Sequence, residues 1–172
     1  MVYDFTKLQA VLGRLSDDTP ARVAETVRTH GRVFLYGAGR SGLMLRALAM
    51  RLSQAERTVY VVGETVTPAI TDGDLLILAS ASGKTESVCM YARIAAEAGA
   101  DILAITATPL SRLTAQAQEC VYLDAPTKDN FNDTDDPMGT LFEQALLLLG
   151  DLIVRELQED VAQMRARHAN LE

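Results

Sequence analysis

The sequence predicts an α/β fold in which helices flank a five-stranded parallel sheet on both faces, giving a three-layer sandwich. Three observations support this prediction. Short apolar segments typical of buried strands alternate with helical segments along the chain. A glycine-rich turn follows the first strand, and a turn rich in hydroxyl groups follows the third. We expect the strand order 2-1-3-4-5, in which the direction of winding reverses between the first and third strands.

The predicted elements follow from local periodicity. Residues 4–29 predict two helices, because apolar residues keep helical spacing on both sides of a capping turn at 16–20. The apolar, β-branched runs expected to form strands are 33–36, 58–62, 75–79, 101–106 and 120–123. The later helices are expected at 43–52, 85–98, 110–118 and, as one long helix, 137–168.

The size and composition of the chain restrict its class. A chain of 172 residues, 48% of them hydrophobic, is expected to form one domain over residues 1–172. No apolar run approaches the roughly 18 residues of a membrane span, and the N-terminus lacks a signal-peptide pattern. Cys89 and Cys120 are too few for a disulfide framework or a metal cage. We therefore expect a cytoplasmic protein without a metal or a membrane partner.

The charge of the chain constrains its ligand. The net charge is −7, and Lys and Arg are scattered along the sequence. This argues against a nucleic-acid partner, because binding to a phosphate backbone needs clustered cations. The overall field would also weakly repel a phosphorylated substrate. Such a ligand must therefore be held by local amides, hydroxyls and a helix end.

The glycine turn after the first strand is a candidate anion site. Gly37, Gly39 and Gly42 have the G-x-G-x-x-G spacing of a dinucleotide-binding loop. Arg40 and Ser41 argue against that interpretation, because they put a charge and a hydroxyl where such loops usually have small apolar residues. Glu64, at the end of the second strand, could bind a ribose and keeps the dinucleotide alternative open.

The stretch 80–87 after the third strand is a second candidate site. Its hydroxyl groups and the following helix start could hold a monophosphate, although they could equally cap the helix. The position of the glycine turn at the neighbouring strand end favours the phosphate. Residues 82–85 also resemble the end of a P-loop, but Leu78 stands where that pattern needs glycine. Lys84 is therefore interpreted as an ordinary loop lysine.

Glu143 is the candidate general base. It is the only charged residue between Asp136 and Asp151, and apolar neighbours would raise its pKa. The pattern Thr140-x-x-Glu143 is also a capping box, which the residues alone slightly favour. His168 near the chain end is interpreted as a solvated histidine, and the Asp-rich stretch 129–136 as a solvated linker rather than a metal loop.

Five segments together resemble the sugar isomerase (SIS) superfamily and, within it, the 6-phospho-3-hexuloisomerase family. The matching segments are 36–42, 61–68, 80–86, 137–143 and 167–172. The resemblance implies an SIS-type fold and the interconversion of D-arabino-hex-3-ulose 6-phosphate and D-fructose 6-phosphate through an enediol. This reaction belongs to the ribulose monophosphate route of formaldehyde fixation. The resemblance also implies no cofactor and a homotetramer with sites near subunit interfaces.

The resemblance assigns roles to individual residues. Glu143 would move the proton between carbons, which overrules the capping interpretation. His168 would enter a neighbouring subunit's site and aid ring opening or proton transfer between oxygens. The residues expected to bind the substrate are Gly39, Arg40, Ser41, Ser80, Ala81, Ser82, Gly83, Lys84 and Thr85.

The chain departs from the family pattern at a few positions, and other functions remain possible. Ala81 replaces a usual glycine, Gln54 stands where some members have histidine, and Val66 replaces a usual threonine. The alternatives are a non-catalytic sugar-phosphate-binding SIS module and an isomerase of another phosphosugar.

Overall fold

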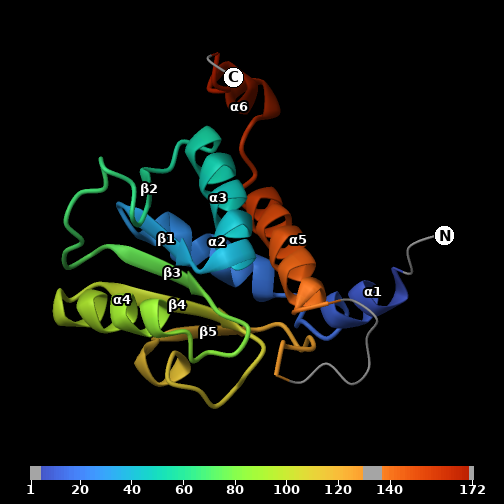
Figure 1. Cartoon of the computed structure of the whole chain (residues 1–172). Helices are drawn as coiled ribbons and strands as arrows, with labels where there is room; N and C mark the ends of the chain where they lie inside the picture. The colour runs from blue at the N-terminus through green and yellow to red at the C-terminus, as the bar shows by residue number, and fades with distance from the viewer. Residues whose placement is uncertain (1–4, 130–136, 171–172) are drawn as a thin grey trace.

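The structure, a computed structural model, describes residues 5–129 and 137–170 and forms the expected three layers around one parallel sheet (Figure 1). The strands are β1 (Val33–Gly37), β2 (Val59–Val61), β3 (Leu75–Ala79), β4 (Asp101–Thr106) and β5 (Glu119–Tyr122). They pair in the order β2-β1-β3-β4-β5, and every pairing is parallel. The prediction of the fold class and strand order is confirmed.

Helices cover the two faces of the sheet unequally. The helices are α1 (Thr6–Leu12), α2 (Thr19–Thr29), α3 (Gly39–Gln54), α4 (Glu86–Glu97), α5 (Thr140–Glu156) and α6 (Val161–Ala166), with a 3₁₀ turn η1 (Thr114–Gln116). Side chains alternate along β3: Leu75 and Ile77 join the larger core beneath α1, α2, α3 and α5, whereas Leu76 and Leu78 join the core beneath α4. The sheet is therefore buried on both faces.

Two helix predictions are wrong in their extent. The single helix expected at 137–168 is two helices, because Gln158 adopts a left-handed backbone conformation (φ 54°) and the Asp160 side chain caps α6 by accepting from Ala162 N–H at 2.8 Å. The helix expected at 110–118 is only the η1 turn. There the Thr114 hydroxyl accepts from Ser111 N–H (3.0 Å) and lies 3.1 Å from the Pro109 carbonyl, so side-chain hydrogen bonds replace helical ones.

The helix expected at 43–52 starts earlier, at Gly39. The glycine turn is thus the first turn of α3 rather than a loop before it. A Cβ atom on Gly42 would lie 2.2 Å from the Gly37 carbonyl oxygen, so only glycine lets the helix start this close to β1. The consequence is that the amides of the first α3 turn point out at the end of β1.

No helix among residues 5–129 and 137–170 combines the length and the apolar character needed to cross a membrane. Cys89 on α4 and Cys120 on β5 are free thiols.

Candidate functional site

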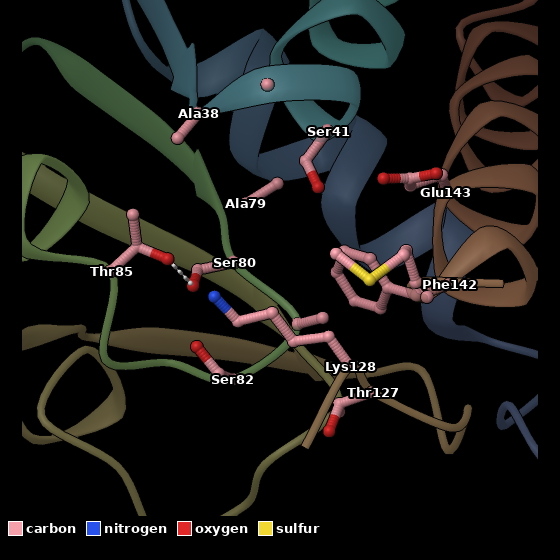
Figure 2. A pocket seen from close by; sticks show the side chains of 14 residues that line it. Ala38, Ser41, Ala79, Ser80, Ser82, Thr85, Thr127, Lys128, Phe142 and Glu143 are labelled. Atoms are coloured by element: carbon pink, nitrogen blue, oxygen red, sulfur yellow. Dashed lines mark hydrogen bonds between the residues drawn. The ribbon is translucent and has the colours of Figure 1, made fainter. Parts of the chain in front are cut away.

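A cavity of about 240 Å³ opens at the carboxyl ends of β1 and β3 (Figure 2). The first turns of α3 and α5 and the loop that leads into α4 surround it. Its lining residues are Ala38, Gly39, Ser41, Ala79, Ser80, Ala81, Ser82, Thr85, Thr127, Lys128, Met138, Gly139, Phe142 and Glu143. This is the strand-order reversal where open α/β sheets bind ligands. The two sequence motifs expected to converge do so here.

The loop of residues 80–85, called the anion loop below, presents hydroxyl groups to the cavity. The side-chain oxygens of Ser80 and Thr85 lie 2.9 Å apart and share a hydrogen bond. Thr85 is the N-cap residue of α4, but its side chain makes no capping hydrogen bond. Within the described ranges, the Ser82 hydroxyl takes part in one long hydrogen bond, which it accepts from Lys84 N–H at 3.4 Å. The hydroxyls are therefore not used up as helix caps, and the capping alternative is wrong for this loop.

The backbone of the anion loop is held in place from β4. The carbonyl of Ala81 accepts hydrogen bonds from Ala107 N–H (3.1 Å) and from the hydroxyls of Thr106 (3.2 Å) and Thr108 (3.1 Å). Gly83 has a positive φ of 62° and donates its N–H to Ser80 O at 3.0 Å. A loop fixed in this way keeps its amides and hydroxyls oriented before a ligand arrives, which suits anion binding.

The first turn of α5 forms the opposite wall. Gly139 is its N-cap with φ 84°, and Thr140 donates its hydroxyl to Pro137 O at 2.6 Å. Thr140 is thus already inside the helix, and the predicted capping box with Glu143 is not formed. Phe142 is fully buried and turns its ring to the cavity, and the Glu143 carboxylate points toward Ser41 across it (Figure 2).

The Glu143 carboxylate is buried with little compensation. Its side chain is 12% exposed, and its Oε2 atom accepts no hydrogen bond from any described residue. The Nε atom of Arg40 lies 2.9 Å from Oε2, an ion-pair distance. Burial raises the pKa of Glu143, Arg40 lowers it, and the net effect is a raised pKa. A carboxylate in this condition can accept a proton from a bound ligand.

Four residues of the predicted site do not line the cavity. The Lys84 ammonium lies 2.8 Å from Asp129 Oδ2, as expected of a loop lysine. Gly83 lies against Ser111 on the side of the loop away from the cavity, and Arg40 forms an ion pair with the lining residue Glu143. His168 follows α6, at the opposite end of α5 from Glu143, beside Arg51 and Asp151 (Figure 1). One subunit does not bring His168 and Glu143 together.

Lys128 is a site residue that the sequence did not indicate. It follows β5, and Figure 2 shows its ammonium turned toward the hydroxyls of Ser80 and Ser82. Its neighbour Asp129 begins the Asp-rich stretch 129–136 that we interpret from the sequence as a solvated linker. Of that stretch, positions 130–136 lie outside the described residues.

The structure gives less support to a dinucleotide or a metal ion as the ligand. Glu64, which kept a dinucleotide open, forms an ion pair with Arg46 and does not line the cavity. Residues 5–129 and 137–170 contain no cluster of three or more His, Cys, Asp or Glu side chains that could hold a metal ion.

The fold and the site together define the class of protein. A family model described as "SIS domain" matches residues 27–151, which include β1 to β5, the anion loop and Glu143. The chain therefore belongs to the SIS domain family.

Relatives within the family narrow the assignment. The 3-hexulose-6-phosphate isomerase of Mycobacterium gastri is 40% identical over 165 residues, 92% of this chain and 83% of that protein. The enzyme of the same name from Bacillus subtilis is 37% identical, over 92% of this chain and 89% of that protein. A solved structure of a hypothetical protein from Methanococcus jannaschii, from which a molecular function of 3-hexulose-6-phosphate isomerase was inferred, superimposes with a TM-score of 0.84 at 30% identity, covering 96% of this chain and 95% of that one. Within the SIS family, this chain groups with the 3-hexulose-6-phosphate isomerases.

Proposed function

We propose that this protein interconverts D-arabino-hex-3-ulose 6-phosphate and D-fructose 6-phosphate. The observation that carries the proposal is the buried Glu143 carboxylate, which faces a pre-formed anion loop across one cavity. The similarity to enzymes named 3-hexulose-6-phosphate isomerase identifies the substrate. Such a reaction has its place in the ribulose monophosphate route of formaldehyde fixation, and we place the enzyme in the cytoplasm.

The roles follow from the two walls of the cavity. The phosphate binds at the anion loop, where hydroxyls, amides and the start of α4 stabilise its charge. Glu143 removes the proton from C2 of the 3-ulose; the electron pair of the C–H bond forms the C2–C3 double bond, and the π pair of the C3 carbonyl moves to O3, which gives an enediolate. The proton on O2 is then transferred to O3, and the carbonyl forms at C2 as the C2–C3 π pair takes the proton that Glu143 returns to C3. The carbonyl has then moved from C3 to C2, with no net oxidation.

A non-catalytic sugar-phosphate-binding module would use the same anion loop. It would need no base, and the burial of Glu143 costs stability that the ion pair with Arg40 does not fully offset, since the net effect is a raised pKa. The arrangement of Glu143 therefore favours an enzyme.

The test is an isomerisation assay on the purified protein. Hexulose 6-phosphate is supplied, and fructose 6-phosphate is measured with a coupled dehydrogenase, with and without a chelator. We expect turnover that survives the chelator, since proton transfer within one substrate needs neither a metal nor a redox cofactor. Binding of fructose 6-phosphate without turnover would instead support the binding module.

We further propose a homotetramer in which His168 reaches a neighbouring subunit's site. Support comes from α6, which has no buried residue in the single chain and exposes 78% of Val161. His168 would assist ring opening or the transfer of the proton between O2 and O3. Mixing inactive Glu143→Gln and His168→Ala proteins should restore part of the activity in mixed tetramers. If no mixture recovers activity, the two residues do not act across an interface.

A further inference from the structure

The anion loop presents no charged group to the cavity, because its one charged residue, Lys84, does not line it. Its donors are hydroxyls and amides, and the protein as a whole has a net charge of −7. Only two charged side chains line the cavity among the described residues, Glu143 and Lys128. Glu143 repels an anion. The balance of charge in the cavity therefore depends on Lys128.

The other cations near the site are engaged elsewhere. Lys84, on the anion loop, is paired with Asp129 at 2.8 Å, and Arg40 is paired with Glu143 at 2.9 Å. Asp129 is the immediate neighbour of Lys128, but it is neutralised by Lys84, which lowers the pKa of its carboxyl group. Within the described part of the chain, Lys128 itself forms no ion pair.

The direction of the Lys128 side chain separates two possible roles. Its ammonium is turned toward the hydroxyls of Ser80 and Ser82 in the anion loop, and away from Glu143 on the opposite wall (Figure 2). A cation that stabilises an enediolate would have to lie at the carbonyl oxygen that gains the charge, next to the carbons within reach of Glu143. A cation beside the anion loop instead contacts the group bound there.

We propose that Lys128 is the charged member of the phosphate site and clamps the phosphate monoester against the anion loop. This deepens the proposed function and rests on it for the identity of the sugar. The requirement on the ligand is a phosphate dianion, whichever sugar carries it. A lysine is suited to this as a point charge with three donors.

The test compares Lys128→Met with Lys128→Arg and with Arg93→Met. Arg93 lies on the exposed side of α4, paired with Glu97, so its replacement removes the same charge far from the cavity. Binding of fructose 6-phosphate, fructose and inorganic phosphate is measured by calorimetry, and KM and kcat by the isomerase assay. Thermal unfolding checks that the variants are folded.

We expect Lys128→Met to weaken fructose 6-phosphate binding and raise KM about tenfold or more, with kcat within about threefold. Inorganic phosphate should lose affinity in parallel, fructose should not, and the dependence of binding on salt should become shallower. Lys128→Arg should restore most of the affinity. Equal affinities in Lys128→Met and Arg93→Met would overturn the proposal, as would a loss of kcat at unchanged KM, which would place Lys128 at the enediolate.

If the proposed isomerase function is wrong, the same measurements would give a different set of results. If the wild-type protein binds fructose 6-phosphate through Lys128 but has no turnover, the role of Lys128 stands and the isomerase assignment falls. If turnover is normal and Lys128→Met leaves KM unchanged, only the role of Lys128 is wrong.

Discussion

The anion loop and the first turn of α5 face each other across one cavity, but their polar groups are in opposite conditions. In the loop, Ser80 and Thr85 bond to each other, and the Ala81 carbonyl accepts three hydrogen bonds. On α5, the buried Oε2 of Glu143 accepts none from the described residues. A satisfied wall is rigid and suits binding, whereas an unsatisfied carboxylate is costly and suits proton transfer. Binding and turnover should therefore be separable by substitution.

Glu143→Gln should give the largest effect and the sharpest separation. The amide keeps the shape of the side chain but cannot accept the proton, so kcat should fall about 10³-fold or more. Fructose 6-phosphate should bind within about threefold of wild type, because the anion loop is untouched. Steady-state kinetics and calorimetry measure the two quantities. Near-normal turnover would show that Glu143 is not the base.

The same variant should be more stable than the wild type. The pKa of Glu143 is raised in the folded state, so its ionised form opposes folding, and this cost is fully present above the folded pKa. Removing it should raise the free energy of unfolding on the order of 1 kcal/mol in that pH range. The difference should shrink as the pH falls below the folded pKa of Glu143, where the wild-type carboxyl takes up its proton, and should vanish below the ordinary pKa of a glutamate. Urea unfolding at several pH values tests this.

The two walls also differ in how tightly their glycines are packed. Gly83 and Gly139 both have positive φ, but a Cβ on Gly83 would lie 2.2 Å from Ser111 Oγ, whereas a Cβ on Gly139 would meet nothing within 4 Å. Gly139→Ala should cost about 1 kcal/mol from backbone strain alone. Gly83→Ala should cost about 2–3 kcal/mol, because the clash is added. Equal melting temperatures would mean that the anion loop is not rigidly packed.

Much of the fold could be predicted because buried parallel strands are continuous apolar runs. The predicted strands at 75–79 and 101–106 coincide with β3 and β4, which are buried on both faces. The helix predictions failed where local hydrogen bonding or backbone geometry competes with periodicity. Thr114 bonds to the nearby backbone in the failed helix, and Gln158 breaks the long one. Neither these hydrogen bonds nor this backbone conformation can be predicted from the pattern of hydrophobic residues.

Part of the candidate site could also be predicted from the sequence. The anion loop is one contiguous segment rich in hydroxyl groups, and these residue types alone indicate anion binding. Lys128 is brought in by the path of the chain after β5, and a lysine beside acidic residues gives no sign of that path. Glu143 was ambiguous, because the capping box and the buried base have the same residues at the same spacing. The backbone conformation of Gly139, which makes it the N-cap, excludes the capping box and leaves the base as the proposal.

Ser82→Ala tests the loop wall with a smaller effect. The Ser82 hydroxyl lines the cavity and, among the described residues, makes only one long hydrogen bond, so we expect it to be available to a ligand. Its loss should raise KM about five- to tenfold, with kcat within about twofold. Ser53→Ala, on the exposed end of α3, is the control. Unchanged binding of fructose 6-phosphate would remove Ser82 from the site.

Arg40→Gln should give the smallest effect, and it tests the link between the walls. Arg40 lies on the first turn of α3 and lowers the pKa of Glu143, against the larger effect of burial. Without the guanidinium, the pKa of Glu143 should rise further. Because the base must be ionised, activity is lost as the pH falls through that pKa, so the acidic limb of the kcat profile should move to higher pH.

The control for Arg40→Gln is Arg46→Gln, which removes a charge from the same helix but from an ion pair with Glu64. Its pH profile should match the wild type. Activity of Arg40→Gln should recover at alkaline pH, where Glu143 is ionised in both proteins. If activity is instead lost at every pH, Arg40 contacts the substrate oxygens directly, as the family resemblance implies. An unmoved acidic limb would mean that burial alone sets the basicity of Glu143, and the α5 wall would then act without help from α3.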